Sequence, residues 1–273
     1  MIIRIGTTSP FSAFIKELKA KPSACAPLPD HPEDYESHIE EWLKKPDHCA
    51  FAVFSEERLT GIFVFLVIES ERYLELLSGL SKSVDAYEEM LQYLEENHAG
   101  WHADFVMNPA NQFLSSALRR RNADFDTEQQ KMRLTHLPPD TDMAGVQLLS
   151  DQWKEQYTAM HSRDVYWIGE RILEAPDRFN VLIAIENNTV IGYLDITKGH
   201  NENDIFGLKV KKGHRRKGYG RKLLAKAIEL NKPKGMILEV NVDNEPAISL
   251  YQSMGFEVIP GRNTITVGWD IGK

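Results

Sequence analysis

A basic, glycine-containing segment in the last third of the chain has the residue types that bind phosphate. The segment VKKGHRRKGYGRKLL follows a predicted strand that ends at Val210 and precedes a helix predicted to begin near Gly220. No Asp or Glu occurs from Ile205 to Ile228, and the same stretch holds nine Lys and Arg residues. The first amide N–H groups of a helix lack intrahelical acceptors, and the helix dipole adds positive potential. We therefore expect a small polyanionic ligand here, against the alternative of a solvated basic face.

The spacing of the glycines narrows the identity of this ligand. A Walker A loop requires Gly-Lys-Ser/Thr, which is absent, and a dinucleotide fingerprint requires a third glycine where Leu223 stands. The pattern that fits is Arg-x-x-Gly-x-Gly, at Arg215, Gly218 and Gly220. Glycine lets the backbone approach a ligand without obstruction by a side chain. A glycine-rich loop shaped only for packing is the alternative interpretation.

A second motif lies downstream, in LEVNVDNEPAISLYQSMGFEVI. After a strand it places an Asn, an Ala, a Leu-Tyr pair and a Gly-Phe pair, which are Asn244, Ala247, Leu250, Tyr251, Gly255 and Phe256. With both motifs in this order and at this separation, the C-terminal half resembles the GCN5-related N-acetyltransferases, the GNAT family. The resemblance implies transfer of an acetyl group from acetyl-coenzyme A (acetyl-CoA).

The resemblance also implies roles for individual residues. Backbone groups of Leu208 and Val210 would pair with the pantetheine arm of the coenzyme, as an added strand pairs with an exposed sheet edge. Asn244 and Tyr251 would lie near the coenzyme sulfur. The pantetheine arm would lie in a cleft between the strand before the loop and the strand Met236–Val242. These two strands would have to diverge there and leave backbone groups unpaired, which the arm can satisfy. The pyrophosphate would be held by the loop residues Arg215, Arg216, Lys217, Gly218, Tyr219, Gly220 and Arg221.

Acyl transfer to an amine needs an acid and a base. The departing thiolate must gain a proton, and the phenol of Tyr251 can supply it; the alternative for Tyr251 is a residue that only packs. The amine must be neutral to attack, so a carboxylate or an ordered water must take its proton. Asp204 and Asp195, near the ends of adjacent predicted strands, are the candidates, and we assign Asp204. A surface carboxylate without a catalytic role is the alternative for each.

The sequence does not identify the acceptor. Four aromatic residues fall on the two helices predicted from Asp142 to Tyr157 and from Tyr166 to Leu173, where GNAT proteins build acceptor pockets: Trp153, Tyr157, Tyr166 and Trp167. Core packing is the favoured role for them. We expect a small-molecule or peptide amine as the partner. A module that binds acyl-CoA without turnover is the alternative function, which retention of Tyr251 disfavours.

The surrounding elements predict an α+β domain. VLIAIE and VIGYLDIT flank Asn187-Asn188 and predict a hairpin, since Asn tolerates the conformations of a tight turn. The predicted order is strand, two helices, three strands, helix, strand, helix and a final strand, ITVGWDI. This order indicates a mixed, mostly antiparallel sheet with a crossover helix. With the two motifs, it implies the acyl-CoA N-acyltransferase fold.

The N-terminal half shows a weaker version of the same pattern. CAFAVFS and GIFVFLVIES correspond to the later hairpin, and the segment that follows them aligns Asn111 with Asn244 and Leu118 with Tyr251. Leu118 cannot donate a proton, and no Arg-x-x-Gly-x-Gly is present in this half. We therefore predict tandem domains, against the alternative of coincidence between two unrelated domains.

Length and composition bound these hypotheses. A chain of 273 residues favours two domains, which we place at 1–127, degenerate and not CoA-binding, and at 128–273, catalytic. The net charge of −8 disfavours nucleic acid, and the longest apolar run, Gly61–Ile68, is too short to cross a membrane. Two cysteines and no evident signal sequence favour a cytoplasmic protein. The spacing of the histidines and cysteines matches no zinc pattern, so we expect no metal.

Overall fold

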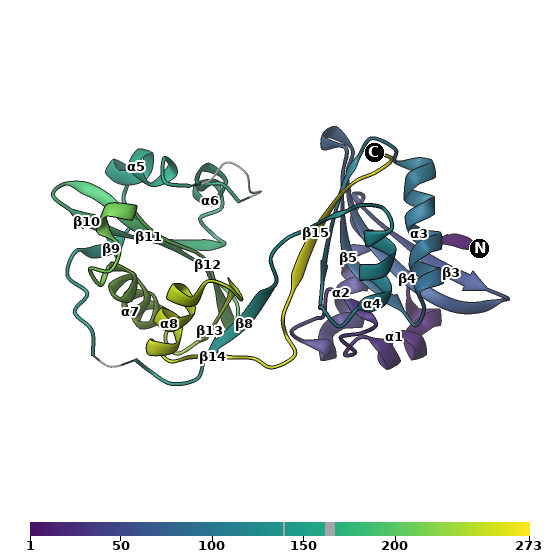
Figure 1. The fold of residues 1–273 in the computed structure, drawn as a ribbon, viewed down its shortest axis with the longest axis horizontal. Coiled ribbons are helices and arrows are strands. Elements are labelled where there is room, and N and C mark those ends of the chain that lie inside the picture. Colours follow the sequence, from purple (N-terminus) through teal and green to yellow (C-terminus); the bar gives the residue numbers. More distant parts are fainter. Residues whose placement is uncertain (139, 162–166) are drawn as a thin grey trace. The chain divides into compact units, whose positions relative to one another are not determined.

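The chain folds into two compact units. The computed structural model describes residues 1–138, 140–161 and 167–273. The C-terminal unit comprises Gln130–Ile259, and the N-terminal unit comprises Met1–Gln129 together with Pro260–Lys273 (Figure 1). Each unit has its own sheet and its own hydrophobic core on both faces of that sheet.

The C-terminal unit contains a seven-stranded sheet in the order β14-β8-β13-β12-β11-β10-β9. Its strands are β8 (Gln129–Leu134), β9 (Val146–Leu148), β10 (Phe179–Glu186), β11 (Thr189–Thr197), β12 (Glu202–Val210), β13 (Gly235–Asn241) and β14 (Phe256–Val258). Strands β9 to β12 form an antiparallel meander, and β12 pairs with β13 in parallel. Asn187 and Asn188 both have positive φ, at 48° and 58°, which confirms the tight turn of the β10–β11 hairpin.

Helices cover both faces of this sheet (Figure 1). Helices α7 (Tyr219–Asn231) and α8 (Glu245–Ser253) lie on one face, and α5 (Lys154–Thr158) and α6 (Gly169–Glu174) lie on the other. The prediction of one helix from Asp142 to Tyr157 is wrong. Gly145 has a φ of 81°, which is incompatible with a continuous helix, and the residues after it pair with the edge of β10 as β9. The predicted helix start at Tyr166 lies outside the described residues.

The N-terminal unit has a sheet in the order β1-β3-β4-β5-β6-β15-β7, with β2 paired to β5 off this path. Its strands are β1 (Ile2–Ile5), β2 (Cys25–Ala26), β3 (His48–Ser55), β4 (Arg58–Ile68), β5 (Tyr73–Ser81), β6 (His102–Met107), β7 (Asp124–Phe125) and β15 (Ile265–Asp270). Its helices are α1 (Ser12–Leu18) and α2 (Tyr35–Trp42) on one face, and α3 (Val84–Asn97) and α4 (Gln112–Arg119) on the other.

The two units exchange their last strands, which corrects the predicted domain assignment. The sequence prediction placed the final strand in the C-terminal domain, but all six residues of β15 pair with β6 of the N-terminal unit. In return, β8, which follows β7 in the chain, lies between β13 and β14 of the C-terminal sheet. The partner of a strand is chosen by tertiary pairing, which the local hydrophobic pattern does not encode.

The internal repeat predicted from the sequence is present in the fold. When the exchanged strands are matched, both sheets have the same strand order. Each also has a β-bulge at the same place, after Val64 of β4 and after Asp195 of β11. The run CAFAVFS lies in β3, and GIFVFLVIES lies in β4 except for its last two residues. These strands occupy the positions of β10 and β11. The two halves are therefore copies of one topology.

Candidate functional site

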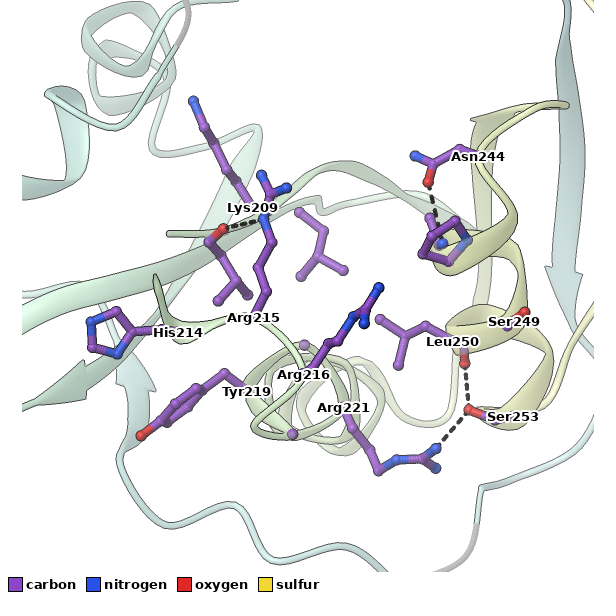
Figure 2. Close-up of a pocket in the computed structure, with 16 residues that line it drawn as sticks. Lys209, His214, Arg215, Arg216, Tyr219, Arg221, Asn244, Ser249, Leu250 and Ser253 are labelled. Atoms are coloured by element: carbon purple, nitrogen blue, oxygen red, sulfur yellow. Dashed lines mark hydrogen bonds between the residues drawn. The ribbon is translucent and has the colours of Figure 1, made fainter. Parts of the chain in front are cut away.

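A cavity of about 670 Å³ lies in the C-terminal unit between β12, the N-terminus of α7 and α8 (Figure 2). All of the predicted coenzyme-binding residues except Lys217 line it, namely Leu208, Val210, Arg215, Arg216, Gly218, Tyr219, Gly220, Arg221 and Asn244. The structure adds residues that the sequence reasoning did not name, among them Ser249 and Ser253 of α8. Tyr251 and Asp204 do not line this cavity.

The cavity opens where β12 and β13 separate. Their parallel pairing ends at Ile205 and Leu238, although both strands continue. The backbone N–H of Lys211 donates to Ile191 of β11 at 2.8 Å. The backbone groups of successive residues in a strand point to opposite sides, so those of Leu208 and Val210 face away from β11. They face the gap between the diverging ends of β12 and β13, which we call the fork. An extended, amide-bearing ligand could pair with this edge, as the sequence analysis expected.

The loop before α7 presents its backbone in an unusual conformation. Arg216 and Gly218 both have left-handed backbones, with φ of 61° and 88°, and Gly218 is the N-cap residue of α7. Left-handed residues beside right-handed ones make successive N–H groups converge into an anion-binding concavity. The N-cap has no side-chain hydrogen bond, so the first amides of α7 receive no acceptor from it.

Glu186, at the end of β10, fixes this loop and was missed by the sequence reasoning. Its carboxylate accepts a hydrogen bond from the Tyr219 hydroxyl at 2.5 Å and lies 2.9 Å from Nδ1 of His214. The Tyr219 hydrogen bond, with Lys217 and His214 nearby, lowers the pKa of Glu186. An acidic residue beside a hairpin turn gives no sequence signal for this role, because the contact is made between distant segments.

Two arginines of the loop are available for a ligand. Arg215 extends toward β12, where its Nε donates to the carbonyl of Val210 at 3.0 Å, and Arg216 extends toward α8 (Figure 2). Among the residues that the structure describes, neither makes an ion pair with a carboxylate. Arg221 is held by α8, since its Nη2 donates to Ser253 Oγ at 2.8 Å. Gly220 allows close approach of the two helices, because a Cβ there would lie 3.0 Å from Leu250.

Asn244 and Tyr251 lie on the same side of α8. Asn244 is the N-cap of this helix, and its Oδ1 accepts the N–H of Ala247 at 3.3 Å, so it has a structural function in addition to its place in the cavity wall. Tyr251 lies one turn after Ala247 and is 7% exposed. Burial raises the pKa of its hydroxyl to about 12, so the phenol keeps its proton at neutral pH.

The two candidate bases differ in environment. Asp204 is partly exposed on β12, and its backbone N–H donates to Thr197 Oγ1 at 2.7 Å. Asp195 is fully buried on β11, on the face covered by α5. The structure places neither carboxylate in the cavity wall.

The predicted aromatic cluster divides into core and surface. Trp153 and Tyr157 are buried in the core beneath α5. Trp167 is less buried and contacts the rings of Phe179 and Phe206, at 5.0 and 6.4 Å between ring centroids. Tyr166 lies outside the described residues. The preference for core packing therefore holds for the first pair.

Comparison with known proteins agrees with this geometry. The Acetyltransferase (GNAT) family model matches residues 145–256. These residues are a GNAT domain. The match spans the cavity and most of the sheet that forms it.

Two curated proteins resemble parts of the chain. An uncharacterized protein of Mycobacterium leprae is 40% identical over 91 residues, which are 32% of this chain and only 25% of that protein. A spermidine N(1)-acetyltransferase of Thermoplasma acidophilum is 25% identical over 129 residues, covering 41% of this chain and 80% of that enzyme. The first match thus spans about a quarter of its relative's length.

The whole chain has the fold of a tandem GNAT protein. A solved tandem GNAT protein from the clavulanic acid biosynthesis pathway aligns with 100% of this chain and 99% of its own, with a TM-score of 0.62 and 14% identity. The predicted fold class and the tandem arrangement are confirmed. In the part of the chain that the structure describes, no helix is long and apolar enough to span a membrane, and no group of ligating side chains could hold a metal ion.

Proposed function

We propose that the C-terminal unit is an N-acetyltransferase that moves an acetyl group from acetyl-CoA to a primary amine of a small molecule or peptide. One observation carries this proposal. A single cavity combines the open edge of β12 with a left-handed loop at the N-terminus of α7. These features suit the two ends of coenzyme A, an amide-bearing arm and a pyrophosphate. The GNAT domain at 145–256 supports acyl transfer of this kind.

In this proposal the coenzyme is held mainly by backbone groups. The pantetheine amides pair with Leu208 and Val210, and the carbonyl of Val210 exchanges its bond from Arg215 for one from the arm. The pyrophosphate accepts hydrogen bonds from amides of the segment 216–221, and Arg215 and Arg216 neutralise its charge. Glu186 keeps the loop in place through Tyr219.

The chemistry requires an acid near the sulfur. A neutral amine attacks the thioester carbonyl, the C–S bond breaks, and the thiolate takes a proton from Tyr251. The raised pKa of Tyr251 keeps the donor protonated at every pH at which the enzyme would work. If water protonates the thiolate instead, the rate of acetyl transfer should depend little on Tyr251.

The test is a thiol-release assay with acetyl-CoA and a panel of amines, using the full chain. Spermidine is a useful first probe because the Thermoplasma acidophilum relative is named for it. The proposal predicts amine-dependent release of coenzyme A by the wild type. Tight binding of acetyl-CoA without release with any amine would favour a non-catalytic acyl-CoA-binding module and would contradict the proposal.

A further inference from the structure

A buried carboxylate and imidazole lie together beneath α5, near the fork but outside the cavity wall. The hydroxyl of Tyr157 donates to Oδ1 of Asp195 at 2.8 Å. Among the described residues, Oδ2 of Asp195 has no hydrogen-bond partner, and neither has Nε2 of His161. These two atoms lie 3.4 Å apart, and the side chains of Asp195 and His161 are 1% and 7% exposed. A short strong hydrogen bond does not join them at this distance.

Two glycines make room for this pair. A Cβ on Gly207 of β12 would lie 3.1 Å from Oδ2 of Asp195. A Cβ on Gly169 would lie 3.0 Å from both Cδ2 of His161 and Cα of Thr158, where α6 begins against the end of α5. The ring of Tyr193 stacks on His161, with centroids 4.2 Å apart and planes 16° apart. The imidazole is therefore held in one orientation with Nε2 toward the carboxylate.

The fold itself does not require an acid at this position. The N-terminal unit has Val64 where the bulge register places Asp195, and Ser78 where it places Gly207. Val64 is fully buried in that unit's core. Burying a carboxylate with an unpaired oxygen costs free energy that a valine does not, so the exchange points to a chemical role in the C-terminal unit.

We propose that Asp195 and His161 together accept the proton of the acceptor amine, which approaches over Gly207; this inference rests on the proposed acetyl transfer. Gly207 is partly exposed and immediately precedes Leu208, whose backbone faces the fork. Because Gly207 has no side chain, Oδ2 of Asp195 lies directly against its backbone, at a place where a Cβ would be only 3.1 Å away. An ammonium ion is attracted there by the carboxylate, next to the place where the thioester would lie.

The nitrogen of the acceptor loses two protons during the transfer. An ammonium ion gives one proton to the pair and becomes a neutral amine, which attacks the acetyl carbonyl. When the C–S bond breaks, the sulfur takes the proton of Tyr251, and Tyr251 regains one from the nitrogen of the forming amide. The amide keeps one N–H, and the pair returns its proton to solvent. No oxidant or further reactant is needed.

The surroundings give the pair a suitable proton affinity. Burial raises the pKa of Asp195 to about 7, although the hydrogen bond from Tyr157 opposes this. Burial, helped by the positive charge of Lys209, lowers the pKa of His161 to about 4, while Glu170 opposes this shift. Among the described residues, the uncharged phenols of Tyr157 and Tyr193 also lie against the pair. The deprotonated pair is therefore available at neutral pH, where a base is most useful.

The experiment compares two nucleophiles in the full chain with acetyl-CoA. Spermidine arrives as a cation and must lose a proton, whereas hydroxylamine is already neutral at neutral pH. Asp195→Asn should lower kcat/KM for spermidine by about 100-fold and remove its rise with pH near neutrality, while hydroxylamine changes by less than about threefold. His161→Gln combined with Asp195→Asn should add little to the single change, because the two act as one unit.

Two further variants keep the test decisive. Gly207→Ala leaves every ionisable group in place but obstructs Oδ2, so it should reduce spermidine turnover more than hydroxylamine turnover. Asp151→Asn, which removes an exposed carboxylate before α5, is the matched control and should change neither. Equal losses for both nucleophiles, or a pH profile that survives Asp195→Asn, would overturn the inference while leaving acetyl transfer intact. If the wild type turns over neither of these nucleophiles nor any other amine of the panel, the proposed function itself is contradicted.

Discussion

The two units contain the same fork but differ in what occupies it. In each, the parallel pair separates after four residue pairs, at Leu76 and Phe105 in the N-terminal unit and at Ile205 and Leu238 in the C-terminal unit. In the N-terminal unit, β2 pairs with the exposed edge of β5. Among the described residues, no strand pairs with the corresponding edge of β12. The fold supplies the fork, and a short strand decides whether a ligand can use it.

The strand β2 takes the hydrogen bonds that a pantetheine arm would make. The N–H of Ser81, which corresponds to Val210, donates to the carbonyl of Ala24 at 3.0 Å. Residues Cys25 and Ala26 continue this pairing along β5. The edge is therefore satisfied within the chain, which gives a physical reason for the predicted loss of coenzyme binding in this unit.

The connections after the fork differ in the same sense. In the N-terminal unit, β5 reaches α3 through Lys82 and Ser83, and Ser83 caps the helix by accepting the N–H of Ala86 at 3.4 Å. The C-terminal unit replaces this cap with the longer basic loop, whose N-cap residue, Gly218, makes no side-chain bond. When a side chain caps a helix, it occupies a first-turn N–H group that could otherwise bind phosphate. In a helix without such a cap, this N–H group stays available.

Replacing the proposed acid should have the largest effect. Tyr251→Phe should lower kcat by about 100- to 10,000-fold, because the hydroxyl acts when charge develops on sulfur, and should leave coenzyme affinity nearly unchanged. The equivalent residue in the N-terminal unit is Leu118, which also has no hydroxyl. This variant therefore makes the C-terminal unit more similar to the N-terminal unit at this position. Steady-state kinetics with calorimetry of acetyl-CoA binding checks it. A loss within about threefold, with chemistry rate-limiting, would mean that another group protonates the thiolate.

Closing the phosphate loop should abolish measurable coenzyme binding. Gly220→Asp places a carboxylate beside the proposed pyrophosphate site and against Leu250, so affinity should fall by about 100-fold or more. Lys82→Gln makes the same change of one charge unit at the corresponding connection of the N-terminal unit and should have no effect on affinity. Calorimetry on both variants decides the point, and equal losses would remove the distinction between the two units.

Neutralising the buried acid should stabilise the protein as pH rises. The pKa of Asp195 is raised from 3.8 to about 7, so the folded state holds a proton that the unfolded state releases, and stability is lost as pH rises through this window. Asp195→Asn should therefore raise the Tm by about 4–8 °C above neutral pH. The difference from wild type should shrink toward acidic pH. Thermal denaturation at matched pH values measures it, and a pH-independent difference would contradict the burial of an ionising carboxylate.

Loosening the segment around β2 should have the smallest effect. Arg262 Nη2 donates to the carbonyl of Pro29 at 2.9 Å and to Asp30 at 2.6 Å, within the N-terminal unit. Because these contacts are partly exposed, Arg262→Ala should lower the unfolding free energy by about 1 kcal/mol, or the Tm by about 2–4 °C. Coenzyme affinity should not change. An altered affinity in calorimetry would show that this segment influences the C-terminal site.

The sequence allowed prediction of the loop and helix residues of the cavity because they are contiguous and carry a recognisable motif. It did not allow prediction of β2, since CA lies in a proline-rich connection without periodicity. The positions of β15 and β8 depend on pairing between distant segments. The Asp195–His161 pair depends on burial and on two glycines distant from each other in sequence. These features arise from tertiary contacts, which local patterns do not contain.

A structure of the full chain with bound acetyl-CoA would show directly which of the two forks holds the coenzyme. We expect one coenzyme per chain, with its phosphates at the amides of residues 216–221 and its arm along Leu208 and Val210. Cys25 and Ala26 should remain paired with β5. Coenzyme in the fork of the N-terminal unit, or an arm that makes no contact with β12, would contradict it.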